Sequence, residues 1–84
     1  MEITKLEKQV LKTYLEDDNV SDFGWNDPHA AAWLDFFAKD AGIDSTSFSG
    51  VIGSLVKKGL VWTNSESFGL TKSGISFIEN GGLE

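Results

Sequence analysis

The sequence predicts a single, mostly α-helical domain that carries a small antiparallel β-hairpin. Three stretches of the chain repeat apolar residues at helical spacing, and two of these stretches end at a glycine followed by an apolar residue, as helices commonly do. Two short runs nearer the C-terminal end, 60–63 and 67–70, are typical of strands. With 84 residues and 40% apolar composition, the chain can form one small core.

The first helix is expected over 5–16. Thr4 and Glu7 fit a capping box, in which each side chain accepts a hydrogen bond from the backbone N–H of the other residue. The apolar residues that follow recur at the spacing of one helix face. They are Leu6, Val10, Leu11, Tyr14 and Leu15.

A second helix is expected over 28–41. Asp27 before Pro28 is a strong start signal, because aspartate accepts hydrogen bonds at an N-cap and proline is favoured at the first helical position. Gly42 is the expected stop. The apolar face would consist of Ala30, Trp33, Leu34, Phe37, Ala38 and Ala41, and we expect Trp33 and Phe37 to lie in the core.

A third helix is expected over 45–58, with Asp44 or Ser45 as its cap and Gly59 as its stop. One face forms an apolar stripe that we expect to be buried: Phe48, Val51, Ile52, Leu55 and Val56. The opposite face is small and polar. It consists of Ser47, Ser49, Gly50, Gly53, Ser54, Lys57 and Lys58.

The two strand-like runs are joined by Asn64-Ser65-Glu66, which is typical of a tight turn. Thr71 then follows the second run and can cap a last helix that continues through Ile78. The expected order is therefore three helices, a hairpin and a short helix.

The stretch from the third helix to the last one resembles the MarR-type transcriptional regulators of the winged helix-turn-helix superfamily. Those regulators show a recognition helix that ends in Leu-x-x-x-Gly-Leu-Val/Ile, then a wing, then Leu-Thr-x-x-Gly. The matching residues are Leu55, Gly59, Leu60, Val61, Leu70, Thr71 and Gly74. The resemblance covers about half the chain, and it implies a winged helix: a three-helix core, a wing and a short C-terminal helix.

The same resemblance implies a DNA-binding module, a small transcriptional regulator that places the helix at 45–58 in the major groove. Hydroxyl groups would contact bases or phosphates, and lysines would contact phosphates. The expected DNA-contacting residues are Thr46, Ser47, Ser49, Ser54, Lys57, Lys58 and Lys72. The chain departs from the family in having no arginine: Gly50 and Gly53 lie in the helix, and the short wing carries Glu66.

The charge distribution supports an alternative function. The net charge is −6, and it arises in residues 1–44, which hold four lysines and ten carboxylates; residues 45–84 hold three of each. Such a balance disfavours nonspecific attraction to DNA. The alternative is an acidic protein–protein interaction module on a winged-helix scaffold that does not bind DNA directly, with an aromatic surface formed by Phe23, Trp25, Phe36 and Trp62.

The aromatic residues leave two expectations open. Phe23 and Trp25 lie in the polar, irregular segment 17–26, where we expect them to fold back onto the core. If two or more of the four aromatic residues were instead exposed together, they would form a partner surface. The partner is therefore double-stranded DNA or a protein, and we expect a monomer or a weak dimer.

Other classes of function lack the residues that they need. His29 is the only histidine and there is no cysteine, so no metal site is expected. The aspartates at 17, 18, 22 and 27 do not match the calcium loop of an EF-hand. No nucleophile–base pair or phosphate-binding glycine motif is present, so we expect neither an enzyme nor a cofactor.

The location and boundaries are also expectations. No apolar run approaches the ~20 residues needed to cross a bilayer, and the N-terminal residues lack the apolar core of a signal peptide. We therefore expect a cytoplasmic protein without a membrane partner. The domain is expected over 1–82, because Leu83-Glu84 resembles the scar of an expression tag.

Overall fold

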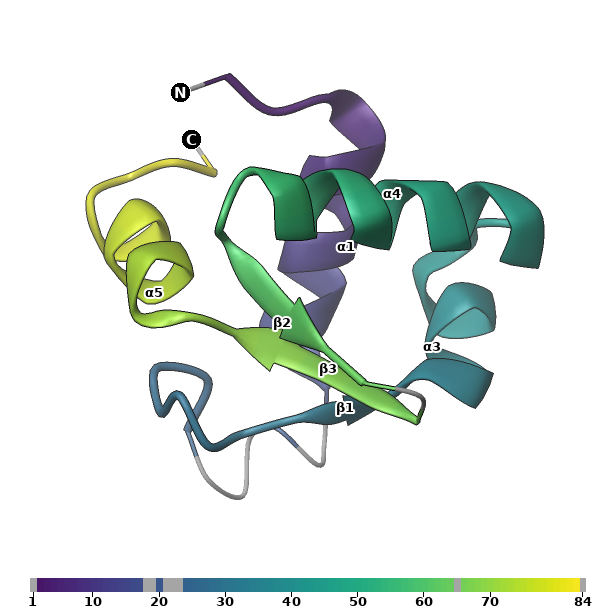
Figure 1. The fold of residues 1–84 in the computed structure, drawn as a ribbon, viewed down its shortest axis with the longest axis horizontal. Helices are drawn as coiled ribbons and strands as arrows, with labels where there is room; N and C mark the ends of the chain where they lie inside the picture. Colours follow the sequence, from purple (N-terminus) through teal and green to yellow (C-terminus); the bar gives the residue numbers. More distant parts are fainter. Residues whose placement is uncertain (1, 18–19, 21–23, 65, 84) are drawn as a thin grey trace.

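The computed structural model describes residues 2–17, 20, 24–64 and 66–83. Figure 1 shows helices packed around a small sheet. In chain order the elements are α1 (Lys5–Glu16), β1 (Ala32–Trp33), α3 (Leu34–Ala41), α4 (Ser45–Lys57), β2 (Val61–Thr63), β3 (Ser67–Leu70) and α5 (Lys72–Glu79). The strands form one antiparallel sheet in the order β1-β3-β2. A mostly helical domain with a small antiparallel sheet is therefore confirmed, and the sheet has three strands rather than the two predicted.

The third strand corrects the predicted second helix. That helix begins at Leu34 and not at Pro28, because Ala32 and Trp33 pair with Phe68 and Ser67 of β3. The Leu34 N–H donates to the Glu66 carbonyl at 2.9 Å and so extends this pairing. The local signal at 27–28 produces a turn instead of a helix start.

Several local predictions are confirmed. The capping box of α1 is present, with the Thr4 N–H donating to Glu7 Oε1 at 2.7 Å and the Glu7 N–H donating to Thr4 Oγ1 at 3.1 Å. Side-chain caps also begin α4 at Asp44 and α5 at Thr71. Gly42 ends α3 in the left-handed conformation that favours glycine, with a φ of 72°.

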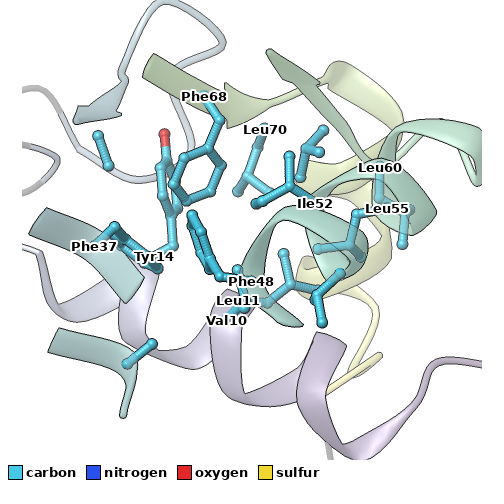
Figure 2. Packing of buried hydrophobic residues seen from close by; sticks show 14 of the residues in the cluster. Val10, Leu11, Tyr14, Phe37, Phe48, Ile52, Leu55, Leu60, Phe68 and Leu70 are labelled. Carbon is cyan, nitrogen blue, oxygen red and sulfur yellow. The ribbon is translucent and has the colours of Figure 1, made fainter. Parts of the chain in front are cut away.

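The core lies between the sheet and the helices α1, α3 and α4, and four aromatic rings form its centre (Figure 2). The Phe37 and Phe68 rings meet edge to face at 4.8 Å, and Tyr14 and Phe48 pack around them. The Tyr14 hydroxyl donates to the Ala30 carbonyl at 3.1 Å, and burial raises the pKa of Tyr14 to about 12. This tyrosine therefore holds the segment before β1 against the core.

Two residues predicted to be buried are exposed instead: Trp33, at 56%, and Val56, at 39%. Leu6, which recurs at the helical spacing of the first helix, is also exposed, at 41%. Leu83 belongs to the core cluster. None of the described helices is long and apolar enough to cross a membrane.

Candidate functional site

The predicted DNA-contacting residues of α4 lie on two different sides of the helix. Ser54 and Lys58 face α1, where both bind the carboxylate of Glu7. The Ser54 hydroxyl donates to Glu7 Oε2 at 2.8 Å, and Lys58 Nζ lies 2.5 Å from Glu7 Oε1. Lys58 Nζ also donates to the Glu2 carbonyl at 3.1 Å. These two side chains of α4 are therefore engaged inside the fold.

Among the residues whose burial the structure describes, Glu7 is the one buried charged residue, with 1% of its surface exposed. Burial alone would raise its pKa, but the hydrogen bonds from Lys58, Thr4 and Ser54 outweigh burial, and the net pKa is lowered. The carboxylate thus stays charged and joins the first turn of α1 to the last turn of α4. Its partner Lys58 is only 28% exposed, so little of this positive charge is offered to a ligand.

The remaining members of the predicted set are exposed: Thr46, Ser47, Ser49 and Lys57 on α4, and Lys72 in the first turn of α5. We call the exposed residues Thr46, Ser49, Gly50, Gly53 and Lys57 the α4 outer face. A Cβ added at either glycine would meet no atom within 4 Å. Apart from Lys57, the α4 outer face therefore carries only small residues, and another molecule can approach the helix backbone closely there.

The α4 outer face attracts an anionic ligand only weakly. Its N-terminal end is occupied by the Asp44 carboxylate, which accepts hydrogen bonds from the Ser47 N–H at 3.0 Å and from the Ser47 hydroxyl at 2.8 Å. These bonds lower the pKa of Asp44. Lys57 supplies a single positive charge at the other end. A phosphate would thus meet a carboxylate where a helix N-terminus otherwise attracts anions.

A shallow groove of about 500 Å³ runs between α3, α4 and the end of β2. Its apolar lining comes from Leu34, Ala38, Phe48 and Ile52. The polar lining carries hydroxyl and amide groups without a charge: Ser45, Ser49, Thr63 and Asn64. The groove lies on the flank of α4 that faces the end of β2, and its lining residues offer no ion-pairing group to a ligand.

The outer face of the sheet carries two tryptophans. Side chains alternate along a strand, and Ala32, Phe68 and Leu70 are buried toward the core. Trp33 pairs with Ser67, and Trp62 pairs with Gly69, so these four residues share the opposite face. We call them the tryptophan face. Trp33 is its most exposed member, at 56%.

Trp62 is held in place on this face, whereas Trp33 is not. A Cβ added at Gly69 would lie 2.8 Å from Nε1 and Cζ2 of Trp62, and it would also clash with the Ala30 carbonyl. The indole of Trp62 therefore lies directly against glycine and is half-buried. Trp33 projects from the neighbouring edge strand, with more than half of its surface open.

The other predicted aromatic residues do not extend this surface. Trp25 is half-buried and packs against the core, as expected. Phe23 lies outside the described residues, and Phe36 belongs to α3 but its side chain lies outside what the structure describes. Of the two described members of the predicted partner surface, Trp25 and Trp62, Trp62 lies on the tryptophan face, and Trp33 was missed.

The sequence offered no local signal that Trp33 is exposed. Its apolar neighbours suggested a helix face, which would have buried it, and nothing local distinguishes that pattern from a short edge strand. The pairing of Trp33 with Ser67, 34 residues later, appears only in the structure.

In the part of the chain that the structure describes, no group of three histidine, aspartate or glutamate side chains is arranged to hold a metal ion. His29 is exposed and lies 3.2 Å from Asp27, where its backbone and ring hydrogen bonds lower the pKa of that carboxyl. The pair is a feature of the 27–30 turn.

Comparison of the chain with protein-family models, with curated proteins and with solved structures found no match to any of them.

Proposed function

We propose that this chain is a winged-helix module that binds a protein partner through the tryptophan face. The winged-helix assignment is supported by the order of helix, strand, two helices and β-hairpin, with α4 directly before the hairpin. Fold alone does not decide function, because one scaffold serves many sites. The choice between a protein and DNA as the partner therefore depends on the properties of the tryptophan face and of the α4 outer face.

The observation that carries the proposal is the exposure of Trp33 on a face without cations. Residues 13–38 hold six carboxylates and no lysine or arginine, and residues 59–71 hold only Glu66 among charged residues. These two segments contain all three strands. A tryptophan of this exposure could bury a further ~150 Å² in an interface, which corresponds to about 3 kcal/mol. Tryptophans of this kind are frequent anchors of protein interfaces.

The DNA alternative has a smaller driving force. Lys58 is bound to Glu7, which leaves Lys57 and Lys72 as the exposed lysines of the predicted set. Two phosphate contacts would give a salt dependence of only about tenfold in affinity between 50 and 200 mM salt, far below that of typical DNA-binding proteins. The net charge of −6 acts in the same direction.

DNA binding through the α4 outer face remains our second candidate because one observation favours it. Gly50 and Gly53 cost helix stability, and a Cβ added at either position would meet no atom within 4 Å, so the two glycines leave room for a ligand backbone. In this mechanism, α4 enters the major groove, Thr46 and Ser49 contact bases or phosphates, and Lys57 contacts a phosphate.

Site-specific photocrosslinking separates the two candidates. A benzophenone amino acid is placed at position 67, beside Trp33 on the tryptophan face, in one variant and at position 49 in another, and each is irradiated in a nuclease-treated lysate of the source cells. We expect a discrete protein adduct from position 67 and none from position 49. An adduct that forms only from position 49, and only when nuclease is omitted, would favour DNA and refute the proposal.

A further inference from the structure

We infer that the outer face of α1 is a second interaction surface, which binds an acidic segment of a protein. The surface is formed by Lys5, Lys8 and Lys12, which we call the lysine stripe. The inference goes beyond the proposed function and does not depend on it, because the lysine stripe and the tryptophan face lie on different sides of the core.

The lysine stripe points away from the core. The opposite side of α1 is buried, and its Tyr14 ring packs 5.3 Å from that of Phe68 on the inner face of the sheet. The three lysines stand at positions i, i+3 and i+7, so they share one side of the helix. Two of them are exposed and the third, Lys8, is partly exposed.

The lysine stripe is a continuous surface whose charges are not neutralised within the fold. Its three side chains border one shallow depression of about 420 Å³, which is completed by Gln9, Thr13 and Glu16. Within the part of the chain that the structure describes, none of the three lysines forms an ion pair with a carboxylate. Three positive charges therefore face solvent on one side of a chain whose net charge is −6.

The charges of α1 are arranged against the stability of the helix. Lys5 is the first helical residue, where the helix dipole disfavours a cation, and the last turn carries no basic residue and ends at Glu16. The lysine stripe also places like charges three and four residues apart, which destabilises a helix. Local rules of this kind are commonly broken where a surface serves function rather than folding. A bound anion would relieve both penalties.

The size of the lysine stripe favours a short acidic segment over nucleic acid. Lys5 and Lys12 are separated by about 10 Å along the helix axis. Glu16 borders the same depression, so a carboxylate follows the three lysines. A long nucleic-acid strand would continue past the lysines to this carboxylate, on a protein of net charge −6. A protein segment with three carboxylates at i, i+3 and i+7 of a helix matches the spacing of the lysines and ends with them.

The test is a ¹H–¹⁵N titration of the whole labelled chain at low salt with the blocked peptide Ala-Ala-Glu-Ala-Ala-Glu-Ala-Ala-Ala-Glu-Ala-Ala. A matched peptide carries glutamine in place of each glutamate. We expect the acidic peptide to shift the amides of Lys5, Lys8 and Lys12 to saturation, and the shifts to weaken as salt is added. The glutamine peptide should leave these amides unmoved.

Two double variants locate the binding. Lys8→Gln with Lys12→Gln should weaken the acidic peptide about fivefold, because each exposed ion pair contributes modestly. Lys57→Gln with Lys72→Gln makes the same change in net charge on other helices and should leave the affinity nearly unchanged. Thermal unfolding of the first double variant should give a midpoint no lower than that of the wild type, because a pair of like charges is removed.

Several results would overturn the inference. No shift with the acidic peptide, equal shifts with the two peptides, or equal losses in the two double variants would show that the lysine stripe does not bind acidic segments. A lower unfolding midpoint in the first double variant would show that the lysines stabilise the fold instead. Equal or tighter binding of a thymidine tetranucleotide with three phosphates at the same amides would show that the surface is not selective for a protein.

Discussion

The α4 outer face and the tryptophan face differ in what they leave unsatisfied. On α4, Ser54 and Lys58 are bound by Glu7, and Asp44 caps the N-terminal end, so the exposed remainder is glycine, hydroxyl groups and one lysine. On the sheet, Trp33 keeps 56% of its surface exposed. The helix that resembles a recognition element has one of its two C-terminal lysines bound within the fold, whereas the sheet retains an open apolar surface.

The strongest test of this difference compares two adjacent lysines. Lys58→Met should reduce the free energy of unfolding by about 2–3 kcal/mol, because it leaves the buried Glu7 carboxylate without its cation. Lys57→Met should change it by less than about 0.5 kcal/mol, because Lys57 is exposed. Urea denaturation measures both. Equal, small effects would mean that the ion pair of Lys58 with Glu7 does not stabilise the fold, which would contradict the comparison of the two faces.

Acidification should remove the same interaction gradually. The folded pKa of Glu7 lies below its ordinary value of 4.5, so its carboxylate stabilises the fold above that pH and this contribution is lost as pH falls through the folded pKa. Glu7→Gln should therefore be less stable than the wild type at neutral pH, and the gap should narrow between about pH 6 and pH 3. A gap that stays constant over this range would contradict the assignment.

Substitution of Trp62 should mainly lower the stability, whereas substitution of Trp33 should mainly lower the binding of the partner. Trp62→Ala should cost about 2 kcal/mol of stability, because its half-buried indole packs against Gly69. Trp33→Ala should cost less than about 0.5 kcal/mol and yet abolish partner binding. Unfolding curves measure the stability, and the photocrosslinking assay with the probe at Ser67 measures the binding. A Trp33→Ala variant that still forms the adduct would remove Trp33 from the interface.

The smallest effect is expected on the α4 outer face. Gly50→Ala and Gly53→Ala should each stabilise the protein by about 0.5–1 kcal/mol, because both positions are helical and an added Cβ meets nothing within 4 Å. Thermal unfolding measures the gain. Partner binding should be unchanged in the double variant. Loss of binding there would indicate that α4, and not the sheet, approaches the ligand.

The features that were predicted correctly from the sequence are those that depend on neighbouring residues in the chain. The caps at Thr4, Asp44 and Thr71 and the stops at Gly42 and Gly59 were found because each depends on residues within one or two turns. The predicted strand boundaries agree with the hairpin to within one residue. The polar outer side of α4 was also predicted, and five of its residues are exposed: Ser47, Ser49, Gly50, Gly53 and Lys57.

The candidate site depended on partners far away in the chain. Strand β1 was missed because the start signal at 27–28 is overridden by pairing with residues about 35 positions later. The role of Lys58 was missed because Glu7 lies 51 residues before it. Both errors have one origin: a residue's exposure is set by tertiary contacts, and neither periodicity nor composition records these contacts. Whether α4 or the sheet binds a partner therefore required the structure.

The most direct measurement combines two readouts: the photocrosslinking assay with the probe at Ser67, and a ¹H–¹⁵N titration of the labelled chain at low salt with a panel of DNA duplexes. The account predicts a protein adduct from position 67 that is lost in Trp33→Ala, and no duplex-induced shift of the amides of Ser49, Gly50 or Gly53. A saturable, salt-sensitive shift of those α4 amides with DNA, in the absence of a protein adduct from position 67, would contradict it.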